Sequence, residues 1–167
     1  MLRALFISLL LFLCLCYQGH AQTDNVNSDS YALYYYCDRI DLQEDYLDNA
    51  LQMARIRDIL AHSPRIDSIA IYAYASPEGA PHRNDWLARR RAEVARDFIL
   101  VNLPNDSVLL PQNIILHPMG ENWEGLYEEL EANYHLMNRD RVMKIMRADI
   151  PAETKKWRLK QLDNGFT

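Results

Sequence analysis

Residues 69–98 read IAIYAYASPEGAPHRNDWLARRRAEVARDF, and this stretch decides the fold. Its first residues end a predicted strand over 66–74, in which successive side chains alternate between the two faces of a sheet. Residues 75–81 contain proline and glycine and are typical of a turn. A helix is predicted from residue 84 to about residue 103. A strand, a turn and a helix in this order favour a layered fold in which the helix packs on the sheet.

One arginine interrupts the apolar face of this helix. Positions spaced by four, three, four and three residues share one face, and they hold Leu87, Arg91, Val94, Phe98 and Val101. We expect this face to pack against the strand residues Ile69 and Ile71. A buried and unpaired charge is strongly unfavourable. Arg91 therefore needs a protein carboxylate, a cluster of carbonyl groups or a ligand carboxylate, unless its side chain reaches past the apolar face to water.

The chain on either side alternates between strands and helices. Upstream, the aromatic segment 31–37 is β-prone and residues 46–61 have helical spacing. Downstream, residues 113–117 predict a third strand and residues 118–120 a turn. Further helices are predicted at 123–133, 138–148 and 151–162, with Gly165 as the C-cap. The sequence thus predicts an α+β fold (an α/β sandwich), in which a β-α-β-α-β layer precedes extra C-terminal helices.

The N-terminus predicts export. A short basic start with Arg3 leads into an apolar run over 4–16, and small residues up to Ala21 precede a predicted cut before Gln22. This is the plan of a secretory signal peptide. Two alternatives stay open: an uncleaved membrane anchor, and a lipoprotein attached at Cys14 or Cys16. Residues 22–30 are polar and are expected to form a flexible lead-in.

The net charge argues against a nucleic-acid-binding protein, and the number of cysteines argues against a fold held by disulfides. Removal of residues 1–21 removes one basic residue, Arg3, and no acidic residue, so that the formal net charge changes from −5 to −6. A mildly acidic chain argues against nucleic-acid binding. Only Cys37 follows the leader, so we expect no intramolecular disulfide. No later stretch is apolar enough to suggest a transmembrane segment.

Several motifs in a consistent order resemble the OmpA-like, peptidoglycan-associating domain. The first set falls at that family's spacings after its second strand: Gly79, Asn84, Leu87, Arg91, Ala92 and Val94. Met119-Gly120-Glu121 is similar to the family's turn after its third strand. The ASPEG turn and the segment 120–126 resemble OmpA-related envelope proteins of the Bacteroides group. The resemblance has motif support over about 32–125 and is weaker from 126 to 163, so the expected domain is 31–163 with a tail at 164–167.

The resemblance implies a non-covalent association with the peptide stem of peptidoglycan, at the periplasmic side of the outer membrane. The family holds diaminopimelate as a zwitterion: a guanidinium pairs with its carboxylate and a carboxylate with its ammonium. Carried over to this chain, Arg91 takes the guanidinium role and Asn84 the polar role at the start of the helix. The turn would contribute Ser76, Glu78 and Gly79.

Two departures from the family pattern bear on function. Where the family has Thr-Asp this chain has Ala75-Ser76, so the usual carboxylate is missing. Glu78, two residues later, is the candidate to replace this carboxylate. The alternative is that Glu78 is a solvated turn residue with no role in binding. The family's final strand also has no counterpart after the last predicted helix. The sheet is therefore expected to be incomplete, either because the chain is a truncated form or because an envelope protein partner fills the open sheet.

The predicted function is that of a non-catalytic envelope protein that binds peptidoglycan. The alternative is a structural or assembly accessory protein of the envelope or of surface appendages that has lost this binding. An enzyme is not predicted, because no nucleophile elbow, phosphate loop or catalytic set is visible. The histidines and Cys37 have no metal-ligand spacing, so neither a metal nor another cofactor is expected.

Overall fold

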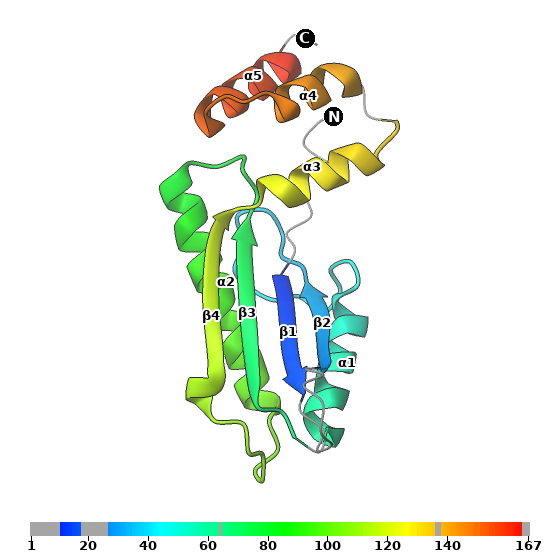
Figure 1. Ribbon diagram of the computed structural model, residues 1–167, viewed down its shortest axis with the longest axis vertical. Helices are drawn as coiled ribbons and strands as arrows, with labels where there is room; N and C mark the ends of the chain where they lie inside the picture. Colours follow the sequence, from blue (N-terminus) through cyan, green and yellow to red (C-terminus); the bar gives the residue numbers. More distant parts are fainter. Residues whose placement is uncertain (1–10, 18–26, 64, 136–137, 165–167) are drawn as a thin grey trace.

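The computed structural model describes residues 11–17, 27–63, 65–135 and 138–164. The protein is α+β, as predicted, and its described residues form one four-stranded sheet and five α-helices (Figure 1). The expected β-α-β-α-β layer is made by β2 (Asn27–Leu33), α1 (Asn49–His62), β3 (Ser68–Ala75), α2 (Pro81–Asn102) and β4 (Ile114–Glu121).

A further strand, β1 (Leu11–Tyr17), lies inside the sheet, whose strand order is β2-β1-β3-β4. It runs antiparallel to both neighbours: Leu13 lies opposite Tyr31 of β2 and opposite Ile71 of β3. Strand β4 runs parallel to β3. Because β1 is antiparallel to both of its neighbours, β2 and β3 are parallel to each other. The three strands predicted from the sequence thus form a parallel set, separated by a strand from the predicted leader.

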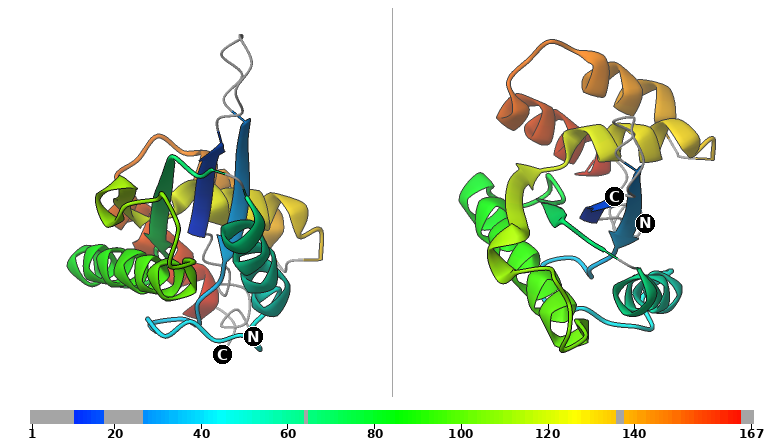
Figure 2. Two further views of the ribbon diagram at one scale, coloured as in Figure 1. Left: turned by 90° about the horizontal axis from the view of Figure 1, so that it is seen from below. Right: turned by 60° about the horizontal axis from the view of Figure 1, so that its bottom comes forward.

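Helices α1 and α2 cover one face of the sheet (Figure 2). Every second residue of β3 is buried, as the predicted alternation requires. The residues at the centre of this core are each at most 1% exposed: Leu33, Ile56, Ile69, Ile71 and Ile99. On the other face, the ring of Tyr72 stacks on His117 with 4.5 Å between the ring centroids. The alternating apolar residues of β3 thus face the helices that cover one side of the sheet.

The predicted apolar face of α2 is only partly correct. Leu87 and Arg91 are buried, whereas Val94 and Phe98 are half-buried and Val101 is 84% exposed. The buried face instead continues through Ala88, Ala92, Ala95 and Ile99. Ala88, Ala92, Ala95 and Ile99 have the same spacing of four, three and four residues as Leu87, Arg91, Val94 and Phe98, but they lie one residue later in the chain. One residue corresponds to about 100° around a helix of 3.6 residues per turn, so the buried face is rotated from the predicted one toward the small alanines, and Leu87 and Arg91 lie at its border.

The first predicted strand was placed too late in the chain. Strand β2 covers residues 27–33, so residues 27–30 of the expected lead-in belong to the sheet and residues 34–37 do not. The backbone of Tyr34 leaves the sheet because Asn49 of α1 binds it from both sides. The Tyr34 N–H donates to Asn49 Oδ1 at 2.7 Å, and Asn49 Nδ2 donates to the Tyr34 carbonyl at 2.8 Å.

The turn predicted at residues 118–120 is also wrong, because these residues continue β4. Pro118 lies opposite Ala73 and Gly120 opposite Tyr74, which leaves Met119 as the extra residue of a bulge. A proline inside a strand is compatible with the edge position of β4. Gly120 has φ +71°, a conformation that favours glycine. The expected turn residues therefore bend the strand without ending it.

Three helices follow the sheet: α3 (Trp123–Ala132), α4 (Arg139–Arg147) and α5 (Ala152–Asn164). They pack on one another around a second apolar cluster that includes Leu126, Leu130, Val142, Met143, Met146 and Leu159. The predicted C-cap Gly165 lies outside the described residues. Among the helices of the described ranges, none is both long and apolar enough to cross a membrane.

Candidate functional site

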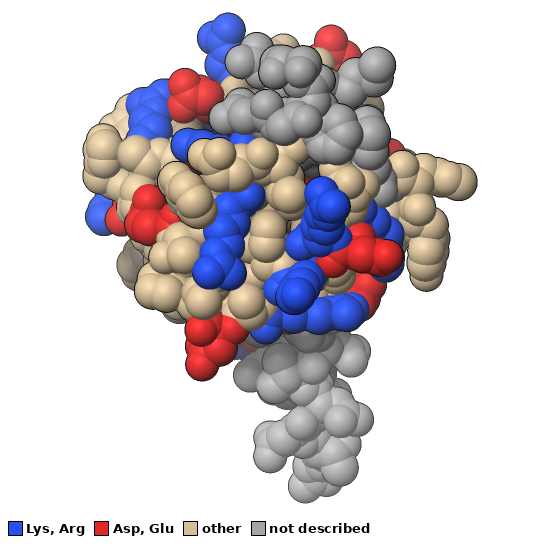
Figure 3. Space-filling model, turned by 90° about the horizontal axis from the view of Figure 1, so that it is seen from above, with Lys and Arg blue, Asp and Glu red and all other residues tan. Residues whose placement is uncertain are grey.

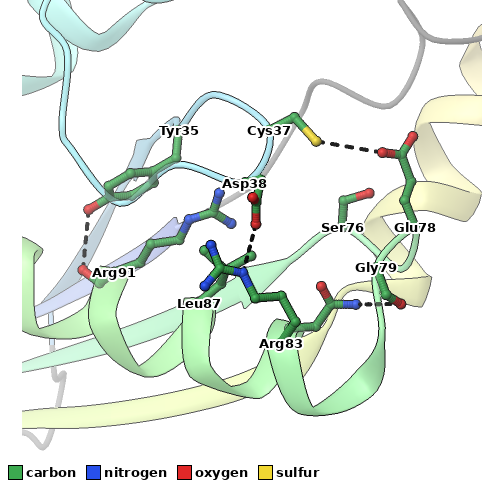
Figure 4. A pocket seen from close by; sticks show the side chains of 10 residues that line it. Tyr35, Cys37, Asp38, Ser76, Glu78, Gly79, Arg83, Leu87 and Arg91 are labelled. Carbon is green, nitrogen blue, oxygen red and sulfur yellow. Dashed lines mark hydrogen bonds and ion pairs between the residues drawn. The ribbon is translucent and has the colours of Figure 1, made fainter.

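A pocket of about 180 Å³ lies where the end of β3, the start of α2 and the loop after β2 meet (Figure 4). The structure brings all five predicted site residues to its wall: Ser76, Glu78, Gly79, Asn84 and Arg91. The loop after β2 contributes Tyr35, Cys37 and Asp38 to the same wall. Helix α2 begins at Pro81, whose fixed φ suits the first position of a helix, so that the turn leads directly into the helix that carries Arg91.

Arg91 is 2% exposed, and its guanidinium donates to three backbone carbonyl groups. Nε binds the carbonyl of Arg39 at 2.8 Å, Nη1 that of Tyr74 at 3.1 Å and Nη2 that of Tyr36 at 3.0 Å. The carbonyl-cluster alternative is therefore confirmed, and the alternative that Arg91 reaches past the apolar face to water is wrong. Burial lowers the pKa of Arg91 to about 10, so the guanidinium stays charged at neutral pH. These three hydrogen bonds use three of the five N–H groups of the guanidinium.

Tyr35 holds the backbone of α2 at the level of this arginine. Its hydroxyl donates to the Arg91 carbonyl oxygen at 3.2 Å, and its ring centroid lies 5.1 Å from the guanidinium carbon. Burial raises the pKa of Tyr35 well above its usual range, so its hydroxyl remains a donor. The loop after β2 is thus fixed to α2 by contacts in both directions.

Asp38 supplies a carboxylate that the sequence prediction did not include. Its backbone has φ +56°, a left-handed conformation that aspartate tolerates better than most residues. Arg83 Nε donates to Asp38 Oδ1 at 2.8 Å. This hydrogen bond lowers the pKa of Asp38, and the charges of Arg83 and Arg91 lower it further. The guanidinium of Arg83 also lies over the ring of Trp86, 4.3 Å from its centroid.

Glu78 is a second carboxylate, at the exposed rim of the pocket. The thiol of Cys37 donates to Glu78 Oε2 at 3.6 Å. Partial burial raises the pKa of Glu78 above its ordinary value, and the hydrogen bond from Cys37 opposes this shift. Burial and the neighbouring Glu78 charge raise the pKa of the Cys37 thiol, so it is not an activated nucleophile.

Asn84 connects the turn to the end of β4. Its Nδ2 donates to the Gly79 carbonyl at 3.3 Å and to Glu121 Oε1 at 2.8 Å. A Cβ atom on Gly79 would lie 2.7 Å from Asn84 Oδ1, so a larger residue at this position would displace the Asn84 side chain from its hydrogen bonds. Trp123 Nε1 donates to the other oxygen of Glu121 at 3.0 Å.

Lys156 of α5 completes this polar cluster from the far end of the chain. Its ammonium donates to the Gly79 carbonyl at 3.0 Å and forms ion pairs with Glu121 and with Glu153. The side chains of Lys156 and Glu121 are only 7% and 13% exposed. The C-terminal helices are therefore tied to the turn that forms the pocket wall.

Sequence reasoning missed Asp38 and Arg83 of the pocket and Lys156 of the adjoining polar cluster. Asp38 is 45 residues from its partner Arg83, and Lys156 is 77 residues from Gly79, so no local spacing relates these pairs. The signal for Lys156 was its helical position: it lies three residues before Leu159, on the face that packs inward.

The pocket is chemically a site of mixed charge. Two guanidinium groups, from Arg83 and Arg91, stand beside the carboxylates of Asp38 and Glu78. Such a set can bind a ligand that carries both a carboxylate and an ammonium group. Figure 3, seen from the end of the molecule above the C-terminal helices, shows Lys and Arg side chains interspersed with acidic ones. Within the described ranges, no three His, Cys, Asp or Glu side chains are grouped so that they could hold a metal ion.

Comparison with protein-family models, with curated proteins and with solved structures gave no match to this chain. The resemblance to the OmpA-like domain therefore stays a prediction from the motifs of the sequence.

Proposed function

We propose that this chain is a non-catalytic protein of the bacterial envelope whose pocket binds the peptide stem of peptidoglycan without a covalent bond. The observation that carries the proposal is the mixed charge of the pocket at the β3–α2 turn. A stem residue such as diaminopimelate presents a carboxylate and an ammonium on the same carbon. The pocket has a donor set for the first and an acceptor set for the second.

Arg91 and Arg83 are assigned to the ligand carboxylate. Arg91 is held by three carbonyl groups, so its remaining N–H groups are oriented before the ligand arrives. Arg83 is half-exposed and would exchange part of its pairing with Asp38 for the ligand.

Asp38 and Glu78 are assigned to the ligand ammonium. Asp38 takes the part of the carboxylate that the sequence lacks at Ser76, because it enters the same pocket from another loop. Glu78 lies at the rim and would close the site on its open side.

The test is co-sedimentation with insoluble peptidoglycan that contains diaminopimelate, using protein purified from the envelope of an expressing cell. We expect Asp38→Asn and Arg83→Ala each to weaken binding about tenfold, as expected for the loss of one charge-assisted contact. Arg89→Ala, on the exposed side of the same helix, is the matched control and should bind normally. A soluble stem peptide with diaminopimelate should compete, and the same peptide with lysine in its place, which lacks the second carboxylate, should not.

The pH dependence of binding separates the two carboxylates. Glu78 has a raised pKa, so acidification protonates it at a pH above its ordinary value of 4.5. Asp38 has a lowered pKa and stays charged until the pH falls below 3.8. Binding should therefore weaken in two steps as the pH falls, and Glu78→Gln should remove the first step. Unchanged binding in Asp38→Asn and in Arg83→Ala would refute the proposal.

A further inference from the structure

We infer that helices α4 and α5 form a basic surface that binds the anionic surface of a lipid membrane without crossing it. This surface is distinct from the pocket, and the inference does not depend on the proposed function. Residues 138–164 contain eight basic and four acidic residues, a net charge of +4, whereas the whole chain has a net charge of −5. All four lysines of the chain lie between residues 144 and 160. The C-terminal helices are therefore basic in a chain that is otherwise acidic.

Three of these basic residues have no polar partner among the residues that the structure describes. Four others are bound by ion pairs or by backbone carbonyl groups: Arg139, Arg147, Lys155 and Lys156. Lys160 makes neither contact, but its charge acts on Glu78 of the pocket and opposes the rise of the Glu78 pKa. The remaining three form no hydrogen bond and no ion pair with the described residues: Arg141, Lys144 and Arg158. Their charges are therefore open to an external anion.

Arg141 and Lys144 lie on the outer side of α4. The buried residues of this helix are Val142, Met143 and Met146, which belong to the second apolar cluster. Because successive helical residues are about 100° apart, Arg141 and Lys144 lie on the side away from that cluster, and both are exposed. Helices α4 and α5 pack against each other at one end of the molecule (Figure 1). Figure 3 shows this end from above, with Lys and Arg side chains spread across it and acidic ones between them.

An exposed tryptophan lies beside one of the unpaired cations. Trp157 of α5 is 61% exposed. The buried residues of this helix are Lys156 and Leu159, so Trp157 and Arg158 lie on the side that faces away from the apolar cluster. A tryptophan side chain combines a large apolar ring with one N–H group, and it is enriched where a membrane meets water. An exposed tryptophan next to an unpaired arginine is therefore typical of a helix that lies on a membrane surface.

The charge of this surface favours anionic lipids. Among the described side chains of residues 138–162, six basic residues but only two acidic residues, Asp140 and Asp149, lie outside ion pairs. Each Lys or Arg near an anionic membrane strengthens binding about fivefold, and zwitterionic headgroups supply no such attraction. An acidic protein would attract the same cations, but it would not supply the boundary between apolar chains and water that suits the ring of Trp157. The exposed tryptophan therefore favours a membrane as the partner.

The experiment measures flotation of the envelope-purified protein with lipid vesicles. One set of vesicles contains about one-third phosphatidylglycerol in phosphatidylcholine, and the other contains phosphatidylcholine alone. The test variant combines Arg141→Gln with Lys144→Gln. The matched control combines Arg55→Gln with Arg89→Gln, which removes two exposed arginines of α1 and α2 that form no ion pair in the described chain. Any effect of residues 1–21 is common to all variants and cancels from the comparison.

We expect the unaltered protein to float with the anionic vesicles and not with phosphatidylcholine alone. The test variant should bind about 25-fold more weakly, at about fivefold for each cation, and the control should differ by less than about twofold. Salt at about 0.5 M should release the protein, because it screens the charges of an exposed surface. All variants should melt at the same temperature, since the replaced side chains are exposed.

The tryptophan provides a second measurement. Anionic vesicles with brominated acyl chains should quench the tryptophan fluorescence of the unaltered protein, because the bromine atoms lie where the ring of Trp157 is expected to enter. Trp157→Ala should remove this quenching, since the other two tryptophans, Trp86 and Trp123, lie outside α4 and α5.

Three results would overturn the inference. The test variant and the control could bind the anionic vesicles equally well, so that α4 would have no part in binding. The protein could bind both kinds of vesicle alike and ignore salt, which would exclude an electrostatic surface. It could also ignore the vesicles but bind soluble polyglutamate in a manner that requires Arg141 and Lys144, which would assign the surface to an acidic protein.

Discussion

At the scale of single residues, Arg91 connects the pocket to the architecture of the sheet. Its guanidinium binds carbonyl groups from the loop after β2 and from β3, which are otherwise separated by β1. The loop residues Tyr36 and Arg39 also form a turn, because the Arg39 N–H donates to the Tyr36 carbonyl at 3.1 Å. The buried guanidinium of Arg91 thereby shapes the wall of the pocket and holds the loop that follows β2.

The first prediction is that Arg91→Ala destabilises the whole protein. The substitution leaves three carbonyl groups without their charged donor and opens a cavity beneath Tyr35. We expect a loss of about 3–5 kcal/mol in the free energy of unfolding, measured by urea denaturation. Arg89→Ala on the exposed side should change stability by less than about 0.5 kcal/mol. Equal and small effects of the two substitutions would show that the carbonyl cluster contributes little. Because Arg91→Ala affects folding, binding tests of the pocket rely on Asp38 and Arg83.

At the scale of elements, the polar cluster around Glu121 joins three parts of the fold. Glu121 ends β4, Asn84 lies near the start of α2 and Lys156 belongs to α5. Asn122 then caps α3, since its Oδ1 accepts from the Gly125 N–H at 2.9 Å. The sheet and the C-terminal helices have separate apolar clusters, so this polar junction sets how the helices sit over the pocket turn.

The second prediction is that Lys156→Ala loosens this junction. A nearly buried Glu121 would lose its cation, and the Gly79 carbonyl would lose a donor. We expect a loss of about 3 kcal/mol in stability, and faster hydrogen exchange in residues 76–84 and in α5 than in β3. Arg158→Ala, an exposed residue of the same helix, is the control. If exchange at residues 76–84 did not change in Lys156→Ala, the C-terminal helices would have no part in positioning the pocket.

The sequence correctly predicted those helices and strands whose apolar residues recur at one regular spacing. Strand β3 and helix α1 lie within a few residues of their predicted ranges, because alternation and helical spacing depend only on near neighbours. Strand β4 was predicted too short because Pro118 and Gly120 usually end a strand, and only the edge position of β4 permits them to continue it.

The candidate site was predictable only where it is local. The five predicted residues all lie on the turn and the helix after β3, within one stretch of sequence. Asp38 reaches the pocket, and Lys156 reaches the polar cluster beside it, by tertiary folding from outside that stretch. The carbonyl partners of Arg91 could not be predicted either, because backbone groups carry no sequence signature.

At the scale of the whole molecule, the position of β1 sets the folding of the chain against its predicted export. The predicted leader must be extended and accessible to the export machinery. In the folded chain, the same residues 11–17 are paired on both sides within the sheet. A precursor that folds before export would therefore retain its leader in the sheet, and each strand pair that stabilises the fold would slow its release.

The third prediction is that weakening the sheet beside β1 increases export of a folded precursor. Ile71 is fully buried and lies opposite Leu13 of β1, so Ile71→Ala should cost about 2–4 kcal/mol by the cavity that it leaves. Full-length precursor is first allowed to fold and is then offered to inverted membrane vesicles, and the protease-protected fraction is measured. We expect Ile71→Ala to be exported several-fold better than the unaltered chain, whereas Ile115→Ala, on the exposed side of β4, should not differ. Precursor diluted from urea should be exported equally well in all three cases, because none of the chains has yet folded. If folded Ile71→Ala and the folded unaltered chain were exported at the same rate, release of β1 from the sheet would not limit export, and the two roles of residues 11–17 would not compete.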